Sequence, residues 1–338
     1  TGAGQDFING GAGNDTLSAT GDNDYLLGQA GNDALNGGAG NDYLEGGTGD
    51  DTLTGGADDD IYAFQTGEVA VGETITETGG TDTLLAWSDT DFSNLAADFG
   101  QIERIVINDG GTATFTGAQL AGETIAINEW WWGGGDVTNL VINVNDAGSV
   151  TQDFSGLTFG ALDTYYDNLW SDGWWWHGEF TDGDDTVTID ATAATVGQSI
   201  IGTTIADTIN GSAFNDFIEG HDGVDTLQGG AGNDLYIVSD ADHRTADEII
   251  DTAGTDDLRF TSTTDAQTLT IYAGDMGLES VTIGTVVGDT SGTTDLNVNA
   301  IAGANALIIT GNDGDNGISG TDYADTINGN GGDDVIVG

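Results

Sequence analysis

Aspartates at intervals of nine residues are the side chains in this sequence that are best suited to chemistry. They follow glycine-rich stretches such as GGAGNDTLS at 10–18 and GGAGNDYLE at 37–45. Carboxylate oxygens are the ligands that hard cations prefer, and glycine lets backbone carbonyls crowd toward a shared centre. The spacing therefore predicts a series of metal-binding turns, with Ca²⁺ as the expected ion.

These turns fall into three blocks, at 1–63, 202–237 and 311–338, of which the last is incomplete. In each nonapeptide the sixth position is acidic and the eighth is apolar, except that an asparagine takes the sixth position once in the third block. We predict that the sixth residues bind the metal: Asp6, Asp15, Asp24, Asp33, Asp42, Asp51, Asp60, Asp207, Asp216, Asp225, Asp234, Asn316, Asp325 and Asp334.

The composition also indicates a multivalent cation as partner. The chain has 58 acidic residues against three arginines and no lysine, which gives a formal charge of −55. Such a chain repels nucleic acid and anionic membranes, and it would stay unfolded unless counterions neutralised it. It has no cysteine, so metal bridges would have to serve where disulfides might otherwise crosslink a secreted protein. No apolar run approaches the ~20 residues that span a bilayer, so we expect no membrane insertion.

The nonapeptide pattern G-G-x-G-x-D-x-U-x, where U is apolar, resembles the RTX, or hemolysin-type calcium-binding, repeat family. The resemblance implies an all-β fold, a parallel β-roll or calcium-loaded β-solenoid. Each nonapeptide would give a turn and a strand of three residues, and two nonapeptides would complete one coil. It also implies type I secretion: the chain would stay unfolded in the low-calcium cytosol and fold outside the cell, which points to a Gram-negative bacterium.

Stacked coils would place aspartates 18 residues apart above one another. The first block would then hold two columns, one with Asp6, Asp24, Asp42 and Asp60 and the other with Asp15, Asp33 and Asp51. Neighbouring carboxylates in a column would be ~5 Å apart. At an effective dielectric of ~20, each unscreened pair costs about 3 kcal/mol, so we expect metal binding and folding to be one event.

Two connectors, 64–201 and 238–310, separate the blocks and resemble each other. DIYAF at 60–64 and GTD at 80–82 return 174 positions later as DLYIV at 234–238 and GTD at 254–256. Alternating β-branched and polar residues predict strands that continue the solenoid. The chain is thus about two copies of one module, and we expect it to be a window on a longer polymer.

The first connector carries a tryptophan-rich insertion at about 128–183. From Asp60 to Asp207 is 147 positions, whereas from Asp234 to Asp325 is 91. The surplus holds seven of the eight tryptophans, which we consider candidate interface or ligand-binding residues: Trp130, Trp131, Trp132, Trp170, Trp174, Trp175 and Trp176.

Three interpretations of these rings remain open. They could fill the core of a small β-subdomain, since aromatic residues bury large areas. They could anchor contacts between copies of the chain, because tryptophan is enriched at interfaces. They could also form a platform that stacks on sugars, which would make cell-surface polysaccharide a partner.

The sequence has no H-E-x-x-H, G-x-S-x-G or P-loop motif and no cysteine nucleophile, so we predict that it is not an enzyme. The expected function is that of a calcium-dependent structural building block of an extracellular or cell-surface assembly, such as a surface layer, filament or large adhesin. The alternative is a non-catalytic calcium- and carbohydrate-binding RTX module of a secreted enzyme.

Overall fold

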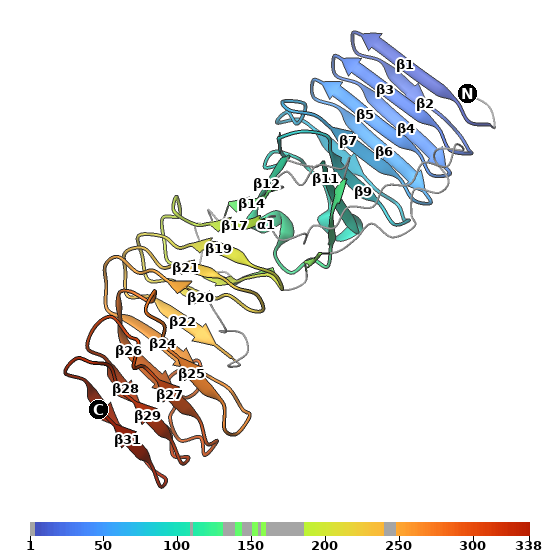
Figure 1. Ribbon diagram of the computed structural model, residues 1–338. Coiled ribbons are helices and arrows are strands. Elements are labelled where there is room, and N and C mark those ends of the chain that lie inside the picture. The colour runs from blue at the N-terminus through green and yellow to red at the C-terminus, as the bar shows by residue number, and fades with distance from the viewer. Residues whose placement is uncertain are drawn as a thin grey trace. The chain divides into compact units, whose positions relative to one another are not determined.

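The computed structural model describes residues 4–108, 111–130, 139–143, 151–154, 157–159, 186–239 and 248–338. Within these ranges the only helices are the 3₁₀ turn η1 (Phe99–Gln101) and α1 (Gly117–Leu120). The strands pair in parallel with strands of neighbouring coils, so the predicted all-β parallel solenoid is confirmed (Figure 1). The chain divides into two compact units, residues 1–141 with 156–186 and residues 142–155 with 187–338. Strand β14 (Asn139–Asn143) spans the point in the sequence where they meet.

The first unit is built on two main sheets whose strands alternate along the chain. One sheet has the order β1 (Phe7–Ala12), β3 (Tyr25–Ala30), β5 (Tyr43–Thr48), β7 (Ile61–Phe64), β9 (Thr83–Ala86), β11 (Arg104–Asn108), β13 (Ala126–Trp130) and β16 (Thr158–Phe159). The other has the order β2 (Thr16–Ser18), β4 (Ala34–Ala39), β6 (Thr52–Ala57) and β8 (Thr74–Thr76). The strands β10 (Thr90–Asp91) and β12 (Thr112–Thr116) also pair.

The second unit repeats this construction with mostly shorter strands. Its longest sheet has the order β15 (Thr151–Asp153), β18 (Ser199–Ile201), β20 (Phe217–Glu219), β22 (Leu235–Val238), β24 (Asp256–Phe260), β26 (Leu278–Ile283), β28 (Ile308–Thr310) and β30 (Thr326–Asn328). Opposite it run β17 (Thr186–Asp190), β19 (Asp207–Asn210), β21 (Thr226–Gln228) and β23 (Glu248–Ile249), and further along β25 (Thr268–Thr270), β27 (Asn297–Asn299), β29 (Gly317–Ser319) and β31 (Val335–Val337).

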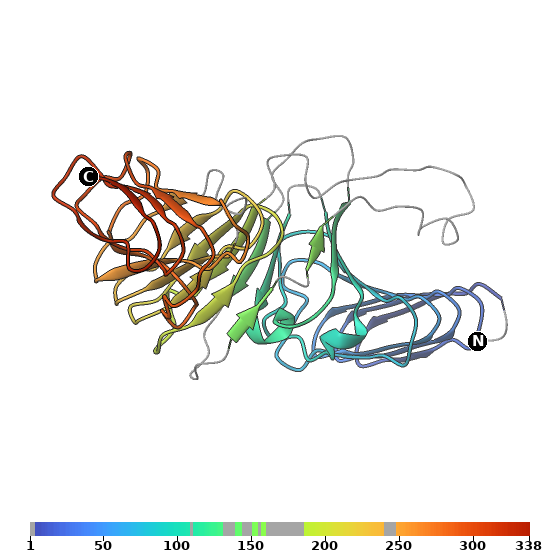
Figure 2. The same cartoon turned by 90° about the horizontal axis from the view of Figure 1, so that it is seen from below.

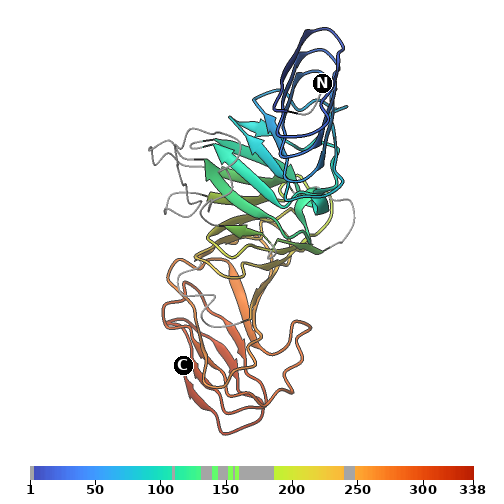
Figure 3. The same ribbon diagram turned by 90° about the vertical axis from the view of Figure 1, so that its right-hand side faces the viewer.

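The register of the strands stacks one apolar residue of each coil on the next. In the first unit Leu26 pairs with Leu44, and Leu44 pairs with Tyr62. All three side chains are fully buried. In the second unit Ile218 pairs with Tyr236 in the same way. Because each such side chain contributes roughly 1.5–3 kcal/mol when buried, this ladder is the core of the fold. Figures 2 and 3 show the stacked coils of each unit from two further directions.

The strands of the first block are longer than predicted. Strands β1, β3, β4, β5 and β6 have six residues, not three, because pairing continues past the apolar residue into the next glycine turn. Gly38, for example, pairs with Gly56 of the next coil. The connectors also continue the solenoid as predicted. In the first, β7 pairs with β9 and β9 with β11, and in the second, β22 pairs with β24 and β24 with β26. In the described part of the chain no helix is long and apolar enough to cross a membrane.

Candidate metal centre

The repeat aspartates form the two columns that the sequence predicts, and hydrogen bonds join them. The backbone N–H of Asp24 donates to Oδ1 of Asp42 at 2.7 Å, and that of Asp42 donates to Oδ1 of Asp60 at 2.8 Å. The second column has the same link, from Asp33 to Asp51 at 2.7 Å. One oxygen of each of these acceptor carboxylates therefore fixes the stacking of two coils that are 18 residues apart.

The second oxygen of these carboxylates is buried and has no hydrogen-bond partner within the protein. Buried polar atoms are almost always paired, so a group of such oxygens requires an explanation. Asp24, Asp42, Asp51 and Asp60 are themselves fully buried. A divalent cation would satisfy them, because Ca²⁺ binds oxygen ligands and these oxygens carry the charge. The atoms concerned are Oδ2 of Asp6, Asp15, Asp24, Asp33, Asp42, Asp51, Asp60 and Asp234.

The first glycine of the nonapeptide is required by this arrangement. A Cβ atom on Gly37 would lie 2.2 Å from Oδ2 of Asp42, and one on Gly28 would lie 2.5 Å from Oδ2 of Asp33. The second glycine of the nonapeptide is required for a different reason. Gly47 adopts φ +94°, and a Cβ there would lie 2.1 Å from the carbonyl oxygen of Gln29. The glycines thus allow the carboxylate and the backbone of the neighbouring coil to approach the same space.

Both columns extend beyond the repeats through acids that the sequence analysis did not select. The N–H of Asp51 donates to Oε2 of Glu73 at 3.1 Å, and that of Asp60 donates to Oδ1 of Asp82 at 2.9 Å. In the second unit Asp256 accepts from Asp234 at 2.8 Å. The duplicated GTD at 80–82 and 254–256 could have identified Asp82 and Asp256 from the sequence. Its aspartate takes the column position on a coil lengthened from 18 to 22 residues.

Three of the predicted ligands in the second and third blocks are satisfied by their own turn. The N–H of Ser212 donates to Oδ2 of Asp216 at 2.6 Å, and its hydroxyl lies 3.0 Å from both carboxylate oxygens. Thr203 bonds to Asp207 and Thr321 bonds to Asp325 through the same N–H and hydroxyl pair. Their assignment as metal ligands stays a prediction, and these hydrogen bonds argue against it.

Three further predicted ligands in these blocks differ in their hydrogen bonds: Asn316, Asp225 and Asp334. The amide nitrogen of Asn316 donates to the carbonyl of Leu296 at 3.0 Å and to Oδ1 of Asn312 at 2.8 Å, so this side chain is bonded as a neutral group. Asp225 and Asp334 keep the column contact, since each Oδ1 accepts a backbone N–H at 2.9 Å. For these residues too, metal binding stays a prediction.

Burial shifts the titration of the column carboxyls. It raises the pKa of Asp42 to about 7 and that of Glu73 to about 8, although a backbone hydrogen bond lowers each. Repulsion from Asp24 adds to the increase at Asp42, and repulsion from Asp51 adds to that at Glu73. Below about pH 7 these carboxyls of the calcium-free protein therefore hold protons, at the positions where the calcium-loaded protein would hold the ion.

We expect protons and calcium to compete for these carboxyls. Because their folded pKa values exceed the unfolded ones, their contribution to calcium-free stability is full below about pH 4 and is lost as pH rises through about 7 to 8. Calcium competes with those protons, so the calcium concentration at the midpoint of folding should be about tenfold lower at pH 8 than at pH 6. Calcium titrations followed by circular dichroism at pH 6, 7 and 8 measure this, and a midpoint independent of pH would contradict it.

The predicted tryptophan sites lie almost entirely outside the described residues. Trp130 is the last residue of β13, but its side chain is not among those described. The other six, Trp131, Trp132, Trp170, Trp174, Trp175 and Trp176, fall outside the described ranges. All three interpretations of these rings therefore remain open.

Comparison with known proteins supports the metal interpretation of the turns. The family model for the RTX calcium-binding nonapeptide repeat matches four segments, residues 1–35, 36–67, 201–236 and 310–338. No curated protein matches the sequence. The matched segments contain the repeat aspartates of the columns, whereas Glu73, Asp82 and Asp256 lie outside them. The chain therefore carries RTX calcium-binding nonapeptide repeats, and these repeats form a β-solenoid.

Proposed function

We propose that this protein is a non-catalytic structural building block of an extracellular or cell-surface assembly, which folds when it binds calcium after secretion. The observation that carries the proposal is the series of buried, partnerless carboxylate oxygens in the first block. A fold whose first block stacks such oxygens in successive turns would need calcium to form, which suits an environment rich in that ion. RTX repeats are also typical of secreted proteins.

Two further observations support a structural role. The strands and turns repeat along the chain, and such coils contact only their neighbours, which suits an extended element. With a formal charge of −55, copies of the chain repel one another unless cations lie between them. Calcium would thus favour both folding and association. The expected partners are copies of the same chain in a surface layer, filament or large adhesin.

Electron microscopy of the full chain with and without calcium tests this proposal. We expect ordered filaments or sheets in millimolar calcium and dispersed chains after chelation. The variant Trp130→Ala/Trp132→Ala should still fold with calcium but should fail to assemble, because tryptophans are frequent interface anchors. Dispersed, folded chains at every calcium concentration would contradict the assembly role. Retention on polysaccharide that the variant loses would favour a carbohydrate-binding module of a secreted enzyme.

A further inference from the structure

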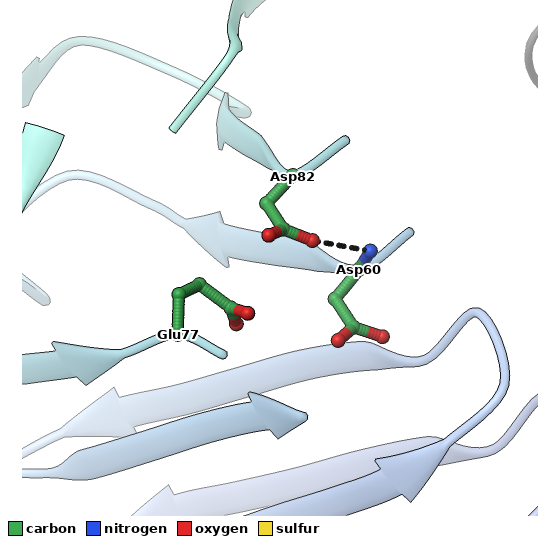
Figure 4. A group of neighbouring side chains, drawn as sticks. All are labelled: Asp60, Glu77 and Asp82. Carbon is green, nitrogen blue, oxygen red and sulfur yellow. Dashed lines mark hydrogen bonds between the residues drawn. The ribbon is translucent and has the colours of Figure 1, made fainter. Parts of the chain in front are cut away.

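Two groups of three acids lie where a repeat block passes into its connector. In the first unit Asp60, Glu77 and Asp82 bring one oxygen each within 4.8 Å of one another (Figure 4). Asp60 precedes β7, Glu77 follows β8 and Asp82 precedes β9. Two of the three therefore come from the connector and lie outside the nonapeptide pattern.

Oxygens converge on one point in this group. A Cβ atom built on Gly55 would lie 2.3 Å from Oδ2 of Asp60, 2.4 Å from the hydroxyl oxygen of Tyr62 and 2.6 Å from Oε1 of Glu77. Asp60 is fully buried, and its Oδ2 has no hydrogen-bond partner. Glu77 is half-buried, but its Oε1 is buried and also has no partner. Two partnerless carboxylate oxygens thus point at one small space beside a glycine.

The second unit contains a similar arrangement with one difference. The hydroxyl of Tyr236 donates a hydrogen bond to Oδ2 of Asp251 at 2.6 Å, so Oδ2 of Asp234 is the buried oxygen of this group that lacks a partner. Oδ2 of Asp234, Oδ2 of Asp251 and the hydroxyl of Tyr236 lie 2.3, 2.5 and 2.5 Å from a Cβ built on Gly229. Asp256 completes the group by accepting the N–H of Asp234 at 2.8 Å, as Asp82 accepts that of Asp60 at 2.9 Å. Each residue lies 174 positions after its counterpart: Gly55 and Gly229, Asp60 and Asp234, Tyr62 and Tyr236, Glu77 and Asp251, Asp82 and Asp256.

These groups differ from the ordinary repeat turn in what faces the carboxylate. A Cβ atom built on Gly28 would lie 2.5 Å from the backbone carbonyl oxygen of Gly46, which belongs to the next coil. At Gly55 the corresponding space receives the Glu77 carboxylate and the Tyr62 hydroxyl instead. A neutral ligand is thereby replaced by a charged one, so the junction has more negative charge to neutralise than a turn inside the block.

We propose that each group is a calcium site of its own, a junction site that ties the last turn of a repeat block to the connector behind it. Asp60 and Glu77 supply the charged oxygens of the first site, and Asp234 and Asp251 supply those of the second. Such hard oxygen donors suit Ca²⁺. The assignment of the ion as Ca²⁺ rests on the proposed calcium-dependent function. The choice of ligands does not, because it comes from the positions of the oxygens.

Equilibrium dialysis with calcium on the full chain tests the junction sites. Glu77→Gln and Asp251→Asn each remove one charge and keep the shape of the side chain. Each single variant should bind one ion fewer than the parent, and the double variant two fewer, with the β-sheet signal of the calcium-loaded protein retained. Glu123→Gln is the matched control, because it changes the same charge on a half-buried acid of the first connector and should leave the count unchanged.

The main competing explanation is that Glu77 and Asp82 share a proton in place of the ion. In that case Glu77→Gln should raise the thermal stability in calcium, since the amide can donate permanently, and the ion count should not change. That result, or an unchanged count in the double variant, overturns the junction sites while leaving the repeat calcium intact. A parent protein that binds no calcium would instead overturn the proposed function.

Discussion

In excess chelator, the circular dichroism spectrum of the protein will lose its β-sheet signal, and calcium at about 10⁻⁴ to 10⁻³ M will restore it. The reason lies in the columns. Asp24, Asp42 and Asp60 lie in one continuous line, each fully buried and each with an oxygen that no protein group satisfies. Without a cation these carboxylates must either hold protons or repel one another in a poorly solvated interior, and the three arginines cannot neutralise 58 acids.

Two controls separate specific binding from general screening. Magnesium should not restore the signal at the same concentration, because its small, rigid shell of six ligands gives up water reluctantly. Sodium chloride screens exposed charges strongly but buried ones weakly, so it should raise the β-sheet signal only slightly. A spectrum in chelator that equals the spectrum in calcium would show that the ladder is stable without the ion.

The fold could be predicted from the sequence because its aspartates and its apolar residues repeat with the same nine-residue period. The nine-residue period of Asp24, Asp33 and Asp42 fixes the turns, and the apolar residue two positions after each fixes the inward face. The resemblance to RTX repeats implies two nonapeptides per coil, and from this the 18-residue register of Leu26 on Leu44 also follows. The added length of the strands did not follow from the pattern, because it depends on whether turn backbones such as Gly38 and Gly56 come close enough to pair.

The candidate site was harder to predict, because the sixth position of the nonapeptide does not decide its chemistry alone. The residue four positions earlier contributes as much. Where it is Ser212, an N–H and a hydroxyl satisfy Asp216, whereas Asp42, which follows Gly38, keeps a partnerless oxygen. The acids of the connectors were missed for a different reason. Glu77 and Asp82 follow no nine-residue period. The duplicated GTD marked Asp82, but the path of the chain was needed to place Glu77 beside Asp60.

Gly37→Ala should weaken calcium binding of the first block about tenfold, although it removes no ligand. The new Cβ would lie 2.2 Å from Oδ2 of Asp42, closer than such atoms can approach, so the carboxylate must leave its position. That movement costs on the order of 1–3 kcal/mol and also breaks the hydrogen bond from the Asp24 backbone. Because neighbouring coils stabilise one another, the calcium midpoint of the whole block should rise. Calcium titration by circular dichroism measures it.

Gly21→Ala is the matched control in the same block. The nearest atom to a Cβ at Gly21 is the carbonyl oxygen of Ala39 at 3.8 Å, which is an ordinary contact. Both substitutions restrict the unfolded chain equally, an effect worth about 0.4–1 kcal/mol in favour of the folded state. The difference between the two variants therefore isolates the contact with Asp42. Equal calcium midpoints would mean that the carboxylate can bind the ion from another position, and that the first glycine of the nonapeptide is not required by the metal site.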